Sequence, residues 1–341
     1  MGQQQGALEG MVKTATNFWK NRPVLVTGAD GIVGSWLIKQ LLQDQAKVIA
    51  FIRDYKRQSE LFLSGDIRRV KVVDGKLEDF KTIQFTIRRY KADTVFHLGA
   101  QTIVGIAQRD PRETFESNIR GTYNVLEACR WHPQLVKRIV VASSDKAYGA
   151  HRHLPYTEDM PLQGRFPYEV SKSCTDLLAQ SYYHSYGLPL VVVRCGNIYG
   201  GGDLNFSRIV PGTIMAFLKR MPPIIRSDGK FVRDYIYVKD VCHAYMLVAE
   251  HLESKKLAGH SFNCSDETPM TVLDMVKNVA RVMNCTKIKP EVLNQAHGEI
   301  RAQYLSATKI RRMLKWRPHY DLTQGLSETV DWYRKLASKS I

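Results

Sequence analysis

Short apolar segments alternate with amphipathic segments through the first two hundred residues of the chain. The runs 23–28 and 47–54 are apolar and rich in β-branched residues, which is typical of strands buried on both faces. The segment between them, 29–45, places large apolar side chains three and four residues apart, and this spacing predicts an amphipathic helix. The same patterns predict further strands over 70–75, 93–100, 137–143 and 189–197, and further helices over 112–130 and 168–187.

The regular alternation ends near Gly200. Beyond it, 212–221 has helical spacing and 231–252 begins as a short strand and continues as a helix, but the elements are shorter and mixed. Buried strands that alternate with helices predict an α/β fold with a Rossmann-like, doubly wound parallel sheet. We expect the C-terminal part to form a smaller substrate-binding region that covers the sheet and leaves a cleft between the two.

A glycine-rich turn joins the first predicted strand to the first predicted helix. Gly28, Gly31 and Gly34 occur in the sequence VTGADGIVGSW. In a strand–turn–helix context, such glycines allow a tight turn and a close approach of the backbone to a pyrophosphate, which then lies at the helix N-terminus. The turn therefore predicts a dinucleotide site, although a purely structural glycine turn would show the same pattern.

The end of the second predicted strand bears on which dinucleotide binds. Asp54 lies twenty residues beyond Gly34, where an acid would accept hydrogen bonds from the ribose hydroxyls of NAD. Arg53 beside it would instead suit the 2′-phosphate of NADP. The sequence favours NAD and leaves NADP open.

Tyr168 and Lys172 stand four residues apart near the start of a predicted helix, so they share one face of it. A tyrosine has a pKa of ~10 and is a weak base at neutral pH. An ammonium group nearby stabilises the phenolate and lowers this pKa. The pair therefore predicts a proton-transfer site beside the dinucleotide.

The sequence IVVASSDKAYG, 139–149, ends a buried strand on a charged pair, Asp145 and Lys146. Two interpretations remain open at this point. The pair is either the solvated end of a strand or a pair of proton-handling groups held at the edge of the sheet.

Composition narrows the class of protein. The 341 residues carry 49 Lys and Arg against 33 Asp and Glu, a net charge of +16, but no nucleic-acid-binding module accompanies the dispersed basic groups. We therefore expect an anionic small-molecule substrate and no nucleic-acid partner. No apolar run approaches the ~18 residues that a membrane span requires. The six scattered cysteines indicate reduced thiols, a cytoplasmic location and no metal site.

Several motifs occur together in one order along the chain, and with them the sequence resembles a known family. They are TGADGIVG, HLGAQ, NIRGTYNVLEACR, SSDKAYG, YEVSK, RCGNIYG and VRDYIYVKD. Over about 22–335 the chain resembles the extended short-chain dehydrogenase/reductase family of nucleotide-sugar epimerases and dehydratases. Within it, the chain is most similar to nucleoside-diphosphate-sugar 4,6-dehydratases of the CDP-glucose 4,6-dehydratase type. The Asp-Lys pair, GSWL and GNIYGGGD carry the closer similarity.

The resemblance implies a nucleotide-sugar substrate and a tightly bound, recycled NAD. It implies oxidation at C4, loss of water across C5 and C6, return of hydride to C6, and a 4-keto-6-deoxy sugar nucleotide as product. The expected catalytic residues are Ser144, Asp145, Lys146, Tyr168 and Lys172. Tyr168 would take the proton of the 4-hydroxyl, neutral Lys146 the C5 proton, and protonated Asp145 would donate to the departing C6 hydroxyl.

The remaining expected site residues fall into two groups. The cofactor-binding residues are Gly28, Gly31, Ile32, Val33, Gly34, Arg53, Asp54, Leu98, Ala100, Gln101, Tyr168 and Lys172. The substrate-binding residues are Asn197, Arg208, Arg226, Arg233 and Arg301. Arg208, Arg233 and Arg301 could each simply be a surface charge, an alternative that is weakest for Arg233.

We expect three regions: a flexible lead-in over 1–21, a dinucleotide-binding Rossmann domain over 22–200, and a region over 201–341 that is mainly a substrate-binding cap, with segments returning to the first domain. The resemblance also implies a homodimer through the helices at 112–130 and 168–186. Their apolar residues extend beyond one core face and include Tyr123, Val125, Tyr182 and Tyr183.

Two other functions compete with the dehydratase. A 4-epimerase or 4-keto reductase of the same fold would need no elimination pair, so Asp145 and Lys146 argue against it. A non-catalytic protein that senses the cofactor would need neither Ser144 nor the Tyr168–Lys172 pair. The nucleotide base and the sugar remain open.

Overall fold

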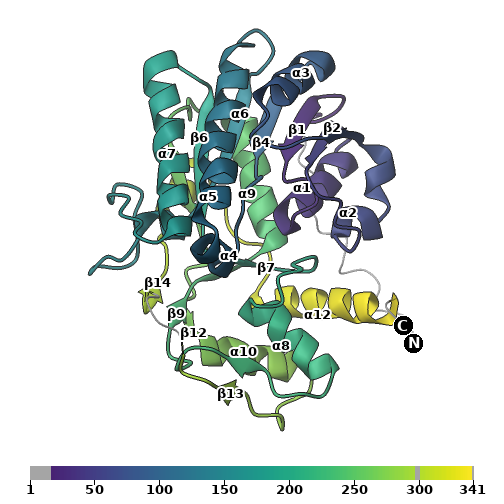
Figure 1. Ribbon diagram of the computed structural model, residues 1–341, viewed down its shortest axis with the longest axis vertical. Helices are drawn as coiled ribbons and strands as arrows, with labels where there is room; N and C mark the ends of the chain where they lie inside the picture. The colour runs from purple at the N-terminus through teal and green to yellow at the C-terminus, as the bar shows by residue number, and fades with distance from the viewer. Residues whose placement is uncertain (1–16, 296–299, 340–341) are drawn as a thin grey trace.

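A seven-stranded parallel sheet forms the centre of the molecule (Figure 1). The computed structural model describes residues 17–295 and 300–339, so most of the expected lead-in lies outside the described residues. The strands follow the order β11-β6-β5-β4-β1-β2-β3, which confirms the Rossmann-like, doubly wound sheet. They are β1 (Pro23–Thr27), β2 (Lys47–Ile52), β3 (Lys71–Asp74), β4 (Thr94–His97), β5 (Arg138–Ser144), β6 (Leu190–Cys195) and β11 (Ser261–Cys264).

Helices cover both faces of this sheet. On one face lie α1 (Ile32–Gln43) and α9 (Val238–His251), which pack against each other. On the other lie α3 (Phe80–Tyr90), α6 (Gly121–Arg130) and α7 (Pro167–Tyr186). Alternate strand residues enter two separate cores, as Val140 and Val141 do. Burial on both faces explains why the strand sequences are continuously apolar.

The strand register brings the carboxyl ends of neighbouring strands to one edge of the sheet. Thr27 of β1 pairs with His97 of β4, and Ser144 of β5 pairs with Cys195 of β6. The glycine turn after β1, the loop after β4 and the Asp145–Lys146 pair after β5 therefore meet at the same edge. In open α/β sheets this edge carries the ligand crevice.

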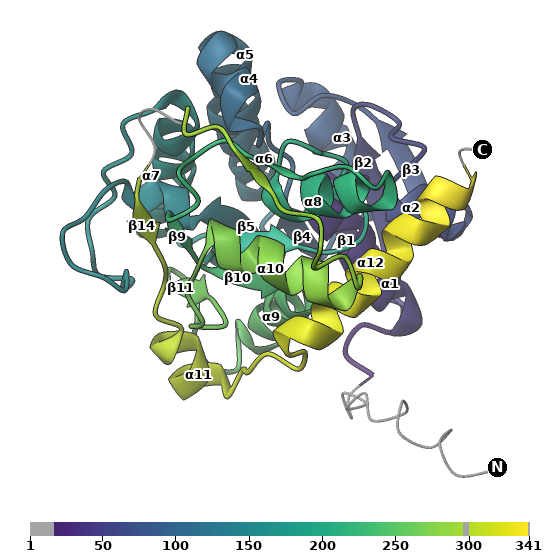
Figure 2. The same ribbon diagram turned by 90° about the horizontal axis from the view of Figure 1, so that it is seen from below.

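A second lobe faces that edge (Figure 2). Its larger helices are α8 (Ile209–Leu218), α10 (Val272–Val282) and α12 (Leu322–Lys339). Its short strands form small sheets and are β7 (Asn197–Tyr199), β8 (Ile224–Ile225), β9 (Val232–Arg233), β10 (Tyr235–Tyr237), β12 (Met270–Thr271), β13 (Glu291–Val292) and β14 (Ala302–Gln303). Both β11 and α9 follow α8 in the sequence, yet they belong to the central sheet and its covering layer.

The remaining elements are single turns or short helices. They are α2 (Glu60–Leu63), η1 (Asp66–Arg69), α4 (Val104–Arg109), α5 (Pro111–Phe115), η2 (Glu116–Arg120), η3 (Asp145–Tyr148) and α11 (Thr308–Leu314).

The helix expected over 112–130 is present as one uninterrupted helical run, but its middle is not α-helical. It is α5, then the π-helical turn η2, then α6. The side chain of Asn118, in the π turn, accepts a hydrogen bond from Gln101 N at 2.7 Å and donates to Ser171 Oγ at 2.9 Å. The widened turn thus fastens the loop after β4 to α7, and π turns commonly occur near functional sites.

Within the described ranges, no helix combines the length and apolar character needed to cross a membrane. All six cysteines are free thiols.

Candidate active site

The turn between β1 and α1 is packed so tightly that it requires glycine. Gly28 has a φ of +65°, and a Cβ placed there would lie 2.8 Å from the backbone of Gly99. A Cβ on Gly34 would lie 2.2 Å from the carbonyl oxygen of Gly28. Gly28 therefore permits the left-handed backbone, and Gly34 permits α1 to begin directly against the turn.

The N-terminus of α1 is open toward the main cleft. Gly31 is the N-cap, no side chain caps the helix, and the first turn holds no acidic residue. The first backbone N–H groups of a helix have no intrahelical partner and favour an anion. Because Gly31, Ile32 and Val33 also line the cleft, this end of α1 fits the pyrophosphate of a dinucleotide.

Buried hydrogen bonds fix the loop after β4 beside this turn. Thr27 Oγ1 accepts from Leu98 N at 3.1 Å and Gly99 N at 3.0 Å, so its own hydroxyl proton is available to His97 Nδ1, 3.0 Å away. His97 Nε2 then donates to Thr122 Oγ1 at 3.1 Å. Burial lowers the pKa of His97 to about 3, so the ring is neutral and acts as part of the scaffold.

The two candidate ribose-binding residues are paired with each other. Arg53 Nε lies 2.6 Å from Asp54 Oδ2, and Arg53 also approaches Glu113 at 3.7 Å. Both line a smaller hollow next to Gly28 and Ala100. The structure thus places Arg53 and Asp54 together at the end of β2, beside the glycine turn.

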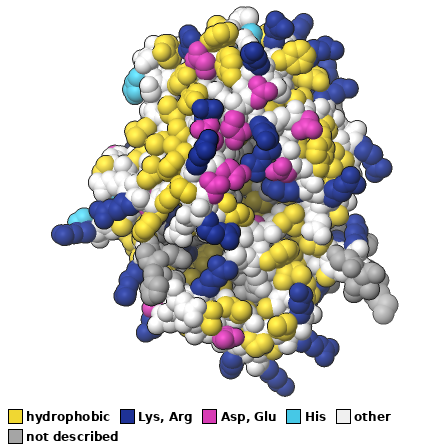
Figure 3. Space-filling model, viewed as in Figure 1, with side chains coloured by type: hydrophobic (Ala, Val, Ile, Leu, Met, Phe, Trp, Pro, Cys, Tyr) yellow, Lys and Arg dark blue, Asp and Glu magenta, His cyan; other side chains and the backbone are white. Residues whose placement is uncertain are grey.

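A cleft of about 1110 Å³ separates the carboxyl edge of the sheet from the second lobe (Figure 3). In the space-filling view it is the hollow at the middle of the molecule, with Lys and Arg side chains at its edge. Most of the expected site residues line it, namely Gly28, Gly31, Ile32, Val33, Gly34, Leu98, Ala100, Ser144, Asp145, Lys146, Tyr168, Lys172, Asn197, Arg208, Arg226 and Arg233.

Two further expected site residues, Gln101 and Arg301, line neither this cleft nor the smaller hollow that holds Arg53 and Asp54. Gln101 is buried, and its side chain bonds Ile103 within its own loop, so it shapes the loop without lining the cleft. Arg301 is exposed and also does not line the cleft, although its carbonyl oxygen accepts a hydrogen bond from Arg233 Nη1 at 3.3 Å.

The end of β5 is not a solvated strand end. The Asp145 side chain is only 2% exposed, and Ser144 Oγ donates to its Oδ1 at 3.0 Å. Burial raises the pKa of Asp145, against the opposing effects of Lys146 and Ser144. Asp145 Oδ2 is buried and has no hydrogen-bond partner among the described residues. A buried carboxyl group with a free oxygen beside a cleft can hold a proton and donate it.

Tyr168 and Lys172 project from the first turns of α7 toward the same edge. Burial raises the pKa of Tyr168 to about 12, opposed by Arg208 and by the Ser144 hydroxyl. Lys172 Nζ donates to the carbonyl oxygen of Ala142 at 2.9 Å, and burial lowers its pKa to about 8. The expected lowering of the tyrosine pKa is therefore outweighed by desolvation in this structure.

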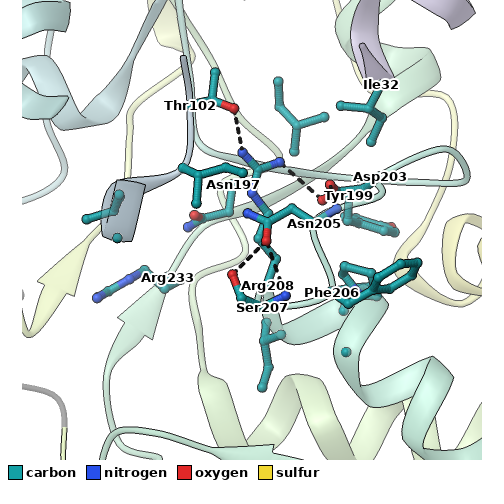
Figure 4. A pocket seen from close by; sticks show the side chains of 18 of the residues that line it. Ile32, Thr102, Asn197, Tyr199, Asp203, Asn205, Phe206, Ser207, Arg208 and Arg233 are labelled. Carbon is teal, nitrogen blue, oxygen red and sulfur yellow. Dashed lines mark hydrogen bonds and ion pairs between the residues drawn. The ribbon is translucent and has the colours of Figure 1, made fainter. Parts of the chain in front are cut away.

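Arg208 bridges the two sides of the cleft (Figure 4). It lies directly before α8, and its Nη1 is 3.1 Å from Asp203 Oδ2 while its Nη2 donates to Thr102 Oγ1 at 3.3 Å. Asn197 and Arg233 lie on the same side of the cleft in this view. Arg233 is largely buried, and its Nη1 donates to the carbonyl oxygen of Val232 at 2.9 Å.

Several residues that shape the site were not expected from the sequence. Thr102 and Asp203 hold Arg208, and Gln303 accepts a hydrogen bond from Lys146. Asp203 could have been found from the sequence alone, because it directly follows the glycine run 200–202. Thr102 and Gln303 had no such signal in the local sequence, because only the tertiary fold brings them to Arg208 and Lys146. Among residues 17–295 and 300–339, no group of three or more His, Cys, Asp or Glu side chains is arranged to hold a metal ion.

The doubly wound sheet, the glycine turn and the Ser144, Tyr168 and Lys172 side chains in one cleft define an extended short-chain dehydrogenase/reductase. The chain belongs to the family described as "GDP-mannose 4,6 dehydratase", whose profile matches residues 25–329.

Individual relatives agree with this assignment. The CDP-glucose 4,6-dehydratase of Salmonella typhimurium is 30% identical over 336 residues, which cover 93% of this chain and 92% of the relative. The dTDP-glucose 4,6-dehydratase of Bacillus anthracis, solved in complex with NAD, is 27% identical with a TM-score of 0.81 and covers 92% of this chain and 97% of its own. A UDP-glucose 4-epimerase from Thermotoga maritima is 27% identical with a TM-score of 0.83, over 92% of this chain and 99% of its own.

Proposed function

We propose that this protein is a nucleoside-diphosphate-sugar 4,6-dehydratase, an enzyme that forms a 4-keto-6-deoxy sugar nucleotide. The observation that carries the proposal is the buried Asp145 carboxyl beside Lys146, in the same cleft as Tyr168. Relatives named as CDP-glucose and dTDP-glucose 4,6-dehydratases support the same reaction.

The site fits NAD. The glycine turn and the open end of α1 suit its pyrophosphate, and Asp54 suits the adenosine ribose. When bound, NAD supplies the oxidation at C4 and the matching reduction at C6. Two related dehydratase structures contain NAD. Arg53 is paired with Asp54, so a 2′-phosphate would have to displace the carboxylate, and this favours NAD over NADP.

Tyr168, Ser144 and Lys172 act at C4. Tyr168 acts as the phenolate, whose oxygen takes the proton of the 4-hydroxyl, and Ser144 hydrogen-bonds the C4 oxygen. Lys172, held by Ala142, contributes positive charge next to the cofactor ribose. The ketone formed at C4 makes the C5 proton acidic, which prepares the elimination.

Lys146 and Asp145 complete the elimination. The Lys146 amine takes the C5 proton and becomes an ammonium, while the C5–H electron pair moves toward C4. The C6–O bond then breaks, and Asp145 gives its proton to the departing hydroxyl, which leaves as water. The raised pKa of Asp145 favours the protonated acid that this step needs.

Asn197, Arg208, Arg226 and Arg233 bind the nucleotide sugar from the second lobe. All four line the cleft, and an arginine fork pairs well with the oxygens of a diphosphate. Arg208 uses two of its five N–H donors on Asp203 and Thr102, so further donors can pair with a phosphate oxygen when the substrate binds. Arg301, which is exposed, would reach the substrate only by changing its position.

A 4-epimerase is the second candidate, because a solved epimerase matches the fold at the same sequence identity as the solved dehydratase. Epimerisation oxidises one carbon, inverts its configuration and reduces it again. No hydroxyl leaves, so the reaction needs no acid for a leaving group. A buried Asp145 with a raised pKa would have no leaving group to protonate in that reaction.

We further propose a homodimer formed through α6 and α7. Tyr123, Leu177 and Tyr186 are large, apolar and between 37% and 58% exposed on these helices. Val125, which we expected at this surface, is instead completely buried in the protein's own core because it faces the sheet. The free thiols support a cytoplasmic location.

The test is a screen of CDP-, UDP-, dTDP- and GDP-linked hexoses, read by mass spectrometry. A dehydratase converts one of them into a product lighter by one water. An epimerase leaves the mass unchanged, and that result with any substrate, without a dehydrated product from the others, would contradict the proposal.

A further inference from the structure

Lys146 is held by a side chain from the opposite lobe. Its Nζ donates to Gln303 Oε1 at 2.5 Å, and the two residues are 157 positions apart in the chain. Gln303 lies at the end of β14 and is completely buried. It does not line the cleft, whereas Lys146 does. The contact therefore links a lysine of the cleft wall to a residue buried outside the cleft.

Strand pairing and hydrogen bonds hold the backbone around Gln303 to two neighbouring segments. In the register of β14 and β9, Gln303 pairs with Arg233. The next residues bond elsewhere: Tyr304 O accepts from Tyr156 N at 2.9 Å, and Leu305 N donates to Asp234 Oδ2 at 3.2 Å. A segment held in this way has little freedom to move, so the amide of Gln303 occupies a defined position.

Only the oxygen of the Gln303 side-chain amide is hydrogen-bonded among the described residues. Gln303 Nε2 is buried without a hydrogen-bond partner among the described residues. A buried amide that is only partly hydrogen-bonded destabilises a fold relative to an apolar side chain of the same shape. Stability alone therefore does not account for a glutamine here, and its contact with Lys146 points to a role in the site.

We infer that Gln303 is a positioning residue that orients the Lys146 amine for removal of the C5 proton. This inference rests on the proposed 4,6-dehydratase function. A neutral amine carries two N–H groups and one lone pair, so an N–H donated to Gln303 fixes where the lone pair points. The uncharged amide accepts this hydrogen bond without the strong preference for an ammonium that a carboxylate would add. Lysine side chains are otherwise highly mobile, which makes an anchor at Nζ effective.

The test measures two steps in a single turnover, namely the appearance of reduced cofactor and the exchange of the C5 proton with deuterated solvent. Gln303→Met keeps the shape and removes the acceptor. We expect C5 exchange to slow by roughly 10- to 100-fold, because small misplacements of a catalytic group have effects of this size, while cofactor reduction stays near wild type. Gln180→Met is the control, since Gln180 bonds Ser261 instead of Lys146.

A double variant separates positioning from a general structural role. If Gln303 acts through Lys146, then Gln303→Met adds no further slowing of the residual dehydration in a Lys146→Ala background. Gln303→Glu keeps an oxygen acceptor but favours the ammonium form of Lys146. This variant should also slow C5 exchange and leave cofactor reduction unchanged. If Gln303→Met does not fold, Gln303→Glu tests the positioning role instead.

Wild-type exchange in the folded variants would overturn the inference, as would equal losses in both steps or additive losses in the double variant. Absence of dehydration in the unaltered protein would instead contradict the proposed function.

Discussion

Burial sets the protonation of the residues around the cleft. Asp145 and Tyr168 both have raised pKa values, while the pKa of Lys172 falls to about 8. Desolvation is the largest cause in all three cases, and it disfavours the charged form of each group. Burial therefore favours the protonated form of Asp145 and brings the pKa of Lys172 closer to neutral pH, and such shifts are typical of functional sites.

Tyr168→Phe tests the first proton transfer. The variant should bind substrate normally, yet reduce the cofactor roughly 10²–10⁴-fold more slowly, because the phenolate that receives the 4-hydroxyl proton is lost. Stopped-flow absorbance of the reduced cofactor measures this rate. Tyr182→Phe, on the same helix, removes a hydroxyl that bonds only Glu127 and should behave as wild type. Equal rates in the two variants would count against the assigned role of Tyr168.

His97 makes stability depend on pH. Its pKa is about 3 when folded and ~6.5 when unfolded, so below ~6.5 the unfolded state binds the extra proton. The contribution is complete above ~6.5 and decreases as the pH falls toward 3. Between pH 7 and pH 5, denaturant titrations of wild type should lose about 2 kcal/mol of unfolding free energy that His97→Gln retains. Exposed His153→Gln should follow wild type, and a parallel decrease in all three proteins would refute this account.

At the scale of elements, the turn from β1 to α1 and the first residues of α1 form one unit. A methyl group on Gly34 would lie 2.2 Å from Gly28 O and 2.9 Å from Ala29 Cα, so the turn must move to accept it. Gly34→Ala should weaken NAD binding by roughly tenfold or more, equal to about 1.4 kcal/mol, as measured by calorimetry. Gly105→Ala is the matched control, since a Cβ there meets nothing within 4 Å. Unchanged affinity in Gly34→Ala would show that this packing is not needed.

The strands and most helices were predictable because their signals are local. Continuous β-branched runs marked the strands, and the glycine spacing marked the first turn. The π turn η2 within the expected helix was not predictable, because its Asn118 bonds to Gln101 and Ser171, which lie far from it in the sequence. The contact of Lys146 with Gln303 likewise joins β14 to η3 through the tertiary fold alone.

At the scale of the whole molecule, the sheet edge supplies the catalytic groups and the second lobe supplies the arginines. This division was predictable in outline from the change of pattern near Gly200. The return of β11 and α9 to the sheet shows that the lobes are not consecutive in sequence. The arginine that bridges the cleft, Arg208, could be placed only with the fold.

The exposed apolar face of α6 and α7 predicts how molecules associate. Leu177→Glu should convert the proposed homodimer to a monomer, because it places a charge in an apolar contact. Light scattering at micromolar protein gives the mass. Phe85→Glu is the control, since Phe85 on α3 is 55% exposed and Leu177 56%. A wild-type protein that is monomeric would rule out the dimer.

The most direct test of the central claim separates oxidation at C4 from the loss of water. In the proposed mechanism Tyr168 begins the first step, whereas Lys146 and Asp145 perform the second. In a single turnover, Lys146→Ala should accumulate reduced cofactor and stop before any product lighter by one water forms, without deuterium at C5. Asp145→Asn should stop at the same stage but still exchange the C5 proton with solvent. Dehydration should be slowed roughly 10²–10⁴-fold in both variants. Normal dehydration in both would contradict the account.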